Sequence, residues 1–166
     1  MDKSVKLKKG SQIITKAAHD ISGDVLVIQM GSNGGWNDYD ELIEQYKAMI
    51  ANSGTECYII IGDTDNPEES VDSANYTSSQ EVGTGDTMWE AALREAFGEH
   101  FVNMRTYLLE NALNIAGLEP TQMDEEDLSQ GRVPETIKYD YTHLNSYGYY
   151  AIGYGVYEKG LELGYW

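Results

Sequence analysis

The sequence has one cysteine and no long hydrophobic run. Because Cys57 stands alone among 166 residues, an intrachain disulfide is excluded and the redox compartment stays open. No apolar stretch approaches the roughly 20 residues that span a bilayer, and the N-terminus lacks the apolar core of a signal peptide. We therefore expect a soluble chain with no membrane partner, cytoplasmic as written, whose secretion would depend on a segment upstream of Met1.

Basic residues are scarce and unevenly placed. The chain has 11 Lys and Arg against 28 Asp and Glu, which gives a net charge of −17. Five lysines precede residue 17, so the remaining 150 residues carry 27 acidic and six basic side chains, a difference of −21. Such a surface repels phosphate backbones, and nucleic acid is not an expected partner.

The length and the 41% hydrophobic content fit one domain with its own core. We divide the chain into a basic N-terminal segment, residues 1–12, and an α/β domain, residues 13–166. In the basic segment Val5 and Leu7 alternate with lysines, which favours an edge strand or a solvated tail over a binding arm.

Strands and helices alternate along the domain. Apolar runs predict buried strands over residues 24–30, 57–61 and 100–104. Helical spacing of apolar residues predicts helices over 13–21, from Asp38 or Asp40 to about Asn52, over 89–97, 106–116 and 145–163, and a short acidic helix from Thr121. Residues 63–87 are polar and predict a long surface loop. This alternation predicts an α/β fold with a parallel sheet covered by helices on both faces.

The last predicted helix, residues 145–163, is rich in tyrosine and glycine. Tyrosine has an apolar ring and a polar tip, so we expect these tyrosines to form a half-buried packing face rather than a ligand stack. Each glycine weakens a helix by about 1 kcal/mol relative to alanine, and close packing against the sheet would offset that loss.

Two short segments carry candidate chemistry. Gly31, Ser32 and Asn33 follow the first apolar run, and ligands of open α/β sheets bind at the carboxyl ends of strands. Asn33 is a candidate donor to an oxyanion, although Asn-Gly-Gly is also ordinary turn chemistry. Asp140 and His143 share a loop before the last helix, where the carboxylate can orient the imidazole as a general base.

At these residues the chain resembles the SGNH (GDSL) family of ester hydrolases. That family places a Gly-Asp-Ser nucleophile block, a Gly block, a Gly-x-Asn-Asp block and an Asp-x-x-His block on a flavodoxin-like sheet. Gly31-Ser32-Asn33 is similar to the third block, with Asn-Gly-Gly-Trp in place of Asn-Asp as in a bacterial subgroup. Asp140-Tyr141-Thr142-His143 matches the fourth. The resemblance covers roughly residues 13–160.

The resemblance implies a flavodoxin-like (SGNH) parallel sheet, truncated here to about three strands. It implies His143 as the general base, Asp140 as its orienting carboxylate, and Asn33 with Gly31 and Ser32 at the oxyanion and substrate site. We expect no cofactor and no metal.

The nucleophile block of the family is missing. Two strands, the nucleophilic Ser and the oxyanion Gly should precede residue 24, and the chain offers only 23 residues there. The resemblance thus implies the C-terminal portion of a longer esterase, whose catalytic Ser lies upstream or on a partner chain.

Gly62-Asp63-Thr64 is similar to the nucleophile block, with Thr in place of Ser, but it follows the strand after the Asn block, where the family has no nucleophile. A calcium loop starting at Asp63 is disfavoured, because Glu68 stands where the turn demands Gly.

Three functions stay open at this point. The first is a hydrolase of acyl or acetyl esters, with carbohydrate esters favoured, that is inactive as this chain alone. The second is a remnant of the same fold that binds carbohydrate, against its exposed tyrosines and tryptophans, or another ligand without turnover. The third is a self-sufficient enzyme that uses Thr64 or Ser32. In the first two, the strand over residues 24–30 loses its neighbour, so we expect self-association through that edge or its cover by residues 1–10.

Overall fold

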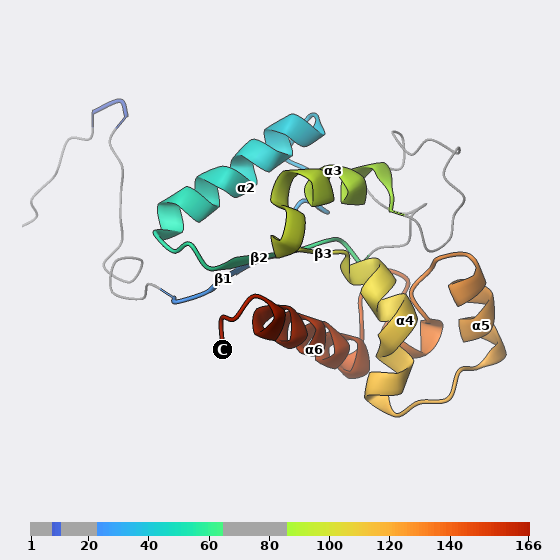
Figure 1. The fold of residues 1–166 in the computed structure, drawn as a ribbon. Helices are drawn as coiled ribbons and strands as arrows, with labels where there is room; N and C mark the ends of the chain where they lie inside the picture. The colour runs from blue at the N-terminus through green and yellow to red at the C-terminus, as the bar shows by residue number, and fades with distance from the viewer. Residues whose placement is uncertain (1–7, 11–22, 65–85) are drawn as a thin grey trace, which may run out of the picture.

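The computed structural model describes residues 8–10, 23–64 and 86–166 (Figure 1). The predicted helix over 13–21, most of the N-terminal segment and most of the loop over 63–87 lie outside these ranges. The described elements are β1 (Leu26–Ile28), α2 (Tyr39–Ser53), β2 (Tyr58–Ile61), α3 (Met88–Phe97), β3 (Phe101–Val102), α4 (Met104–Ala116), α5 (Gln122–Ser129) and α6 (Ser146–Glu162), with short 3-10 helices at Gly98–His100 and Glu135–Ile137.

The three strands form one parallel sheet in the order β1-β2-β3. This confirms the predicted α/β class. Side chains alternate across β2, so that Ile60 points to one face of the sheet and Ile59 and Ile61 to the other. In Figure 1, α2 and α3 lie over one face, and α4 and α6 lie on the opposite side.

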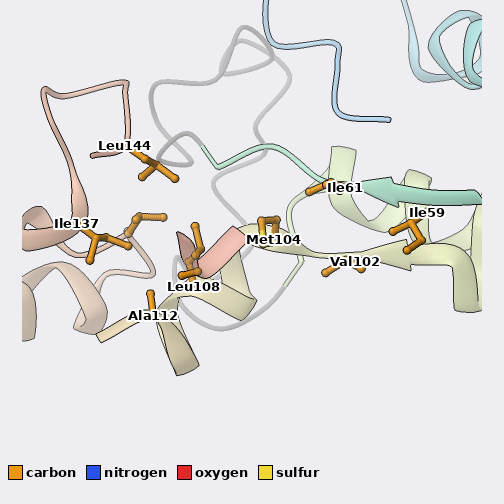
Figure 2. Close-up of a cluster of buried hydrophobic side chains, with 10 residues drawn as sticks. Ile59, Ile61, Val102, Met104, Leu108, Ala112, Ile137 and Leu144 are labelled. Atoms are coloured by element: carbon orange, nitrogen blue, oxygen red, sulfur yellow. The ribbon is translucent and has the colours of Figure 1, made fainter. Parts of the chain in front are cut away.

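Each face of the sheet carries its own core. The α2–α3 side buries Ile28, Ile60 and Phe101 against Leu42, Tyr46, Trp89, Leu93 and Phe97. The α4–α6 side buries Ile59, Ile61 and Val102 against residues of α4, α6 and the segment between them, as Figure 2 shows for Met104, Leu108, Ala112, Ile137 and Leu144. The sheet therefore lies between two packed helical layers.

The first strand is shorter and less buried than its sequence predicts. Only Leu26–Ile28 pair with β2, and Val27 is 42% exposed, so the prediction of a strand over 24–30 buried on both faces is wrong. Val27 pairs with Ile59 and so points to the α4–α6 face. On that face α6 packs against β2 and β3, which leaves Val27 at the uncovered margin.

Helix α6 packs through its small residues and the aliphatic Ile152 and Val156, not through its tyrosines. Gly148, Ala151 and Gly155 are buried, whereas the tyrosines at positions 147, 149, 150, 154 and 157 are exposed. A Cβ on Gly155 would come within 2.7 Å of the Tyr107 ring of α4, so glycine permits the close approach of the two helices. The prediction that the tyrosines form the packing face is wrong, because the helix needs small residues where it meets α4.

A buried ion pair joins α3 to the start of α4. Arg105 donates from Nε and Nη2 to the two carboxylate oxygens of Glu90, each at 2.8 Å. Both side chains are buried, at 2% and 5% exposure. Glu90 also accepts from the backbone N–H of Thr87, and Arg105 Nη1 donates to the carbonyl of Gly131. The pair thus fixes α3, α4 and the segment after α5 to one another.

We predict opposite effects for two alanine substitutions in α6. In Gly148→Ala the new Cβ would lie 2.7 Å from the carbonyl oxygen of Ile137 and 2.8 Å from the Cβ of Leu144, so the helix must shift. We expect a loss of about 1–3 kcal/mol in the free energy of unfolding from this overpacking. The matched control is Gly153→Ala, which meets nothing within 4 Å and should raise stability by about 0.5–1 kcal/mol. Urea denaturation of both variants measures the difference, and equal stabilities would contradict the packing of α6 described above.

Candidate functional site

The segment after β1 folds into a tight turn. The backbone N–H of Gly34 donates to the carbonyl of Gly31 at 2.9 Å, and Gly31 has a φ of 112°. A Cβ at Gly31 would also lie 2.7 Å from the Trp89 ring, so glycine is required there twice over. Asn33 is exposed at the turn, and its side chain makes no hydrogen bond with any described residue. The turn expected of Asn-Gly-Gly is therefore present, and the Asn33 amide is left free to bind another group.

Two tryptophans support this turn. Trp36 Nε1 donates to the Gly31 carbonyl at 2.9 Å, and the Trp36 and Trp89 rings lie 5.6 Å apart. Tyr46 of α2 donates to the neighbouring carbonyl of Met30 at 2.6 Å, and burial raises the pKa of Tyr46 to about 12. The Trp89 indole N–H is buried without a hydrogen-bond partner among the described residues. The Gly31 turn is thus held by hydrogen bonds from Trp36 and Tyr46 and lies against the two tryptophan rings.

The second segment is a small hairpin in front of α6. Lys138 and Leu144 form an antiparallel bridge, and Tyr139 donates its backbone N–H to the carbonyl of His143 at 2.7 Å. Asn145 closes the hairpin, because its Nδ2 donates to the carbonyl of Lys138 while its Oδ1 caps α6. Leu144 is buried in the α4–α6 core. These anchors hold the intervening residues, 139–143, out from the surface in a fixed shape.

Asp140 and His143 form a hydrogen-bonded dyad on that hairpin. His143 Nδ1 lies 2.9 Å from both carboxylate oxygens of Asp140. The carboxylate also accepts the backbone N–H groups of Thr142 and His143, at 3.0 and 2.7 Å. These hydrogen bonds, that of the His143 backbone first, lower the pKa of Asp140. A charged Asp140 favours the proton on Nδ1, and so leaves Nε2 with a lone pair, as a general base requires.

The dyad lies toward the carboxyl ends of the strands. Tyr165, which follows α6, accepts from the backbone N–H of Tyr58 at the start of β2. The end of α6 is thus at the amino end of the sheet, and its beginning, with the hairpin, is toward the carboxyl end. Leu144 shares a core cluster with Ile61, the last residue of β2, and Figure 2 shows both. Asn33 also follows a strand end, as the sequence predicts.

The described residues do not join the two segments or supply a nucleophile. Nε2 of His143 has no hydrogen-bond partner among them, and the His143 side chain is 66% exposed. No hydrogen bond links His143 to Ser32 or Thr64 in these ranges, and the Thr64 backbone N–H instead donates to Asp63 at 2.7 Å. The dyad is therefore a base without a substrate hydroxyl in the part of the chain that the structure describes.

Sequence reasoning missed two hollows beside α6. One, of about 300 Å³, lies where the edge of β3 meets α4 and α6, and the other, of about 280 Å³, lies between α4 and α6. Tyr107 and Glu158 line both. The tyrosines of α6 were the available signal. We expected them to form a packing face, although carbohydrate binding by exposed tyrosines and tryptophans was among the functions left open.

Comparisons with models of protein families, with curated proteins and with solved structures found no match to this chain. Within the described ranges, no helix is both long enough and apolar enough to cross a membrane. Nor does any group of three or more His, Cys, Asp or Glu side chains in those ranges gather in a way that could hold a metal ion.

The lowered pKa of Asp140 gives a test of the dyad geometry. Because the folded hairpin holds the charged carboxylate, the Asp140 carboxyl should titrate below its ordinary value of 3.8. The stabilisation is present above that value and is lost as the pH falls through the lower pKa of the folded state. A titration of the carboxyl ¹³C shift of Asp140 by NMR measures this, and the His143 amide shift should move with the same midpoint. A midpoint at or above 3.8 would contradict the described hairpin.

Proposed function

We propose that this chain is the base-bearing part of an SGNH-type ester hydrolase. The observation that carries the proposal is the dyad: Asp140 is fixed by two backbone N–H groups and orients His143, whose Nε2 stays free. An Asp-oriented imidazole is the arrangement that activates a serine hydroxyl in acyl transfer. The three-stranded parallel sheet with helices on both faces supports a flavodoxin-like frame for it.

In this reaction the catalytic Ser comes from a segment upstream or from a partner chain. His143 Nε2 takes the hydroxyl proton while the Ser oxygen attacks the ester carbonyl, and Asp140 stabilises the imidazolium that forms. The free Asn33 amide donates to the oxygen that becomes negative. The proton then passes from His143 to the leaving alcohol, and water releases the acyl group by the same steps. Acyl or acetyl esters, with carbohydrate esters favoured, are the proposed substrates, and no cofactor is needed.

Ligand binding without turnover is the second candidate. The exposure of His143 and the lack of a nucleophile among the described residues favour it over a self-sufficient enzyme. In that case the dyad is inherited and inert, and the fold serves to bind a carbohydrate or another ligand.

The hydrolase proposal predicts how activity depends on the upstream segment. The chain alone should neither hydrolyse 4-nitrophenyl acetate above the buffer rate nor react with a fluorophosphonate probe. Extension with the in-frame coding sequence upstream of Met1 should add a Gly-Asp-Ser block and restore both. In the extended protein, His143→Ala should lower kcat by about 10³-fold or more, and Asn33→Ala by about 10²–10³-fold.

Tyr139→Phe serves as the matched control, because Tyr139 is on the same hairpin and is exposed. It should keep full activity. Unchanged hydrolysis in His143→Ala would refute the proposal, and labelling of Ser32 or Thr64 in the chain alone would favour the self-sufficient enzyme. Ligand binding by an extended protein that has no Gly-Asp-Ser block would favour the non-catalytic remnant.

The edge of the sheet predicts where the upstream part docks. Strand β1 pairs only with β2 among the described residues, and Val27 is exposed beside that edge. We propose that β1 pairs with a strand of the upstream part, or with a second copy when that part is absent. Sedimentation should show self-association of the chain alone, weakened by Val27→Lys and abolished in the extended protein. A chain that stays monomeric at all concentrations, with β1 uncovered, would contradict this.

A further inference from the structure

The two hollows beside α6, which we call the α4–α6 groove, lie where α4 and α6 approach each other closely. Gly155 of α6 meets the ring of Tyr107 on α4, and the Tyr107 hydroxyl donates to Glu158 at 2.6 Å. Burial, followed by this hydrogen bond, raises the pKa of Tyr107, so its hydroxyl stays protonated and its position is held. Tyr107 and Glu158 therefore form a fixed boundary shared by the two hollows.

Aromatic rings and polar groups converge on the second hollow. Tyr150 and Tyr154 of α6 line it and are 59% and 40% exposed. Their hydroxyls, and the side-chain amide of Asn114, make no hydrogen bond with any described residue. Asn111 also lines the hollow and donates to the carbonyl of Tyr107, which leaves its side-chain oxygen as an acceptor. The hollow thus offers flat apolar rings together with unused donors and acceptors.

The charges around the two hollows disfavour an anionic ligand. Glu158 lines both hollows, and the chain as a whole carries −17, so an anionic ligand is repelled. Arg94 and Lys159 also line the first hollow, together with Glu110 and Glu162. Both bases are paired with carboxylates, Arg94 with Asp86 and Lys159 with Glu162, so they offer no free positive charge to an anion. Charged side chains of both signs can still exchange hydrogen bonds with hydroxyl groups.

We propose that the α4–α6 groove binds a neutral oligosaccharide. The apolar faces of sugar rings suit the rings of Tyr150 and Tyr154, and sugar hydroxyls can use the free amide of Asn114 and the free tyrosine hydroxyls. The first hollow is at the lower limit of the size range of small-molecule sites, and the second is just below it. Because they share a boundary, a chain of two or more sugar units can span both. This site is separate from the dyad and requires no catalysis. It gives the second candidate function, ligand binding without turnover, a place in the fold, and it holds equally if the chain is part of a hydrolase.

The test is calorimetric titration of the whole chain with linear xylo-, cello-, manno- and chito-oligosaccharides of three to six units. At least one series should bind, with affinity rising from three units as the ligand comes to span both hollows. Tyr150→Ala and Tyr154→Ala should each weaken binding at least tenfold, and Asn114→Ala severalfold.

The matched control is Tyr149→Ala, since Tyr149 is on the same helix, is 57% exposed and lines neither hollow. It should bind as the unchanged chain does. His143→Ala should also bind normally, which separates this proposal from the hydrolase. The absence of binding to every series would overturn the proposal, as would equal losses in Tyr149→Ala and Tyr150→Ala. A change of sedimentation in Tyr150→Ala without any effect on sugar binding would instead assign this face to a second copy of the chain.

Discussion

The ion pair between Glu90 and Arg105 is the contact on which much of this structure depends. It is buried and bidentate, and charges in such a place are tolerated only when their hydrogen bonds are satisfied. Glu90 meets this condition with the Thr87 backbone, and Arg105 with the Gly131 carbonyl. Three segments far apart in the sequence are thereby fixed around the end of β3. The segment from Gly131 then leads through buried Ile137 into the hairpin of the dyad.

Local rules predicted most of the elements. Asp38, one of the two expected caps, begins α2, and Gly54 ends it in the left-handed region, because these positions depend only on nearby backbone groups. The Ile59–Ile61 run is a buried strand, since helices cover both of its faces. The same rules predicted that β1 and α6 exist, but not which of their side chains are buried. The burial of Val27 and of the α6 tyrosines depends on which other elements cover them. The local sequence pattern does not contain that information.

In the candidate site too, local contacts could be predicted from the sequence and long-range contacts could not. Asp140 and His143 are three residues apart on one hairpin, so their spacing was sufficient to predict the hydrogen bond between them. Whether they face Asn33 depends on how segments more than 100 residues apart pack together. Among the described residues, no hydrogen bond joins the hairpin of the dyad to the turn that carries Asn33. The groove could not be predicted, because α4 and α6 contribute Tyr107 and Tyr150 from positions more than 40 residues apart. Tyrosine spacing alone does not say which side of a helix meets its neighbour.

Helix α6 has a glycine side and a tyrosine side, and substitutions on the two sides have different consequences. Gly148 and Gly155 hold the helix against the rest of the protein, so a change there alters the packing of the domain. The tyrosines contribute little to that packing, so they can be exchanged one at a time at small cost in stability. A surface of this kind can change its ligand within few mutational steps, while the scaffold beneath it stays the same.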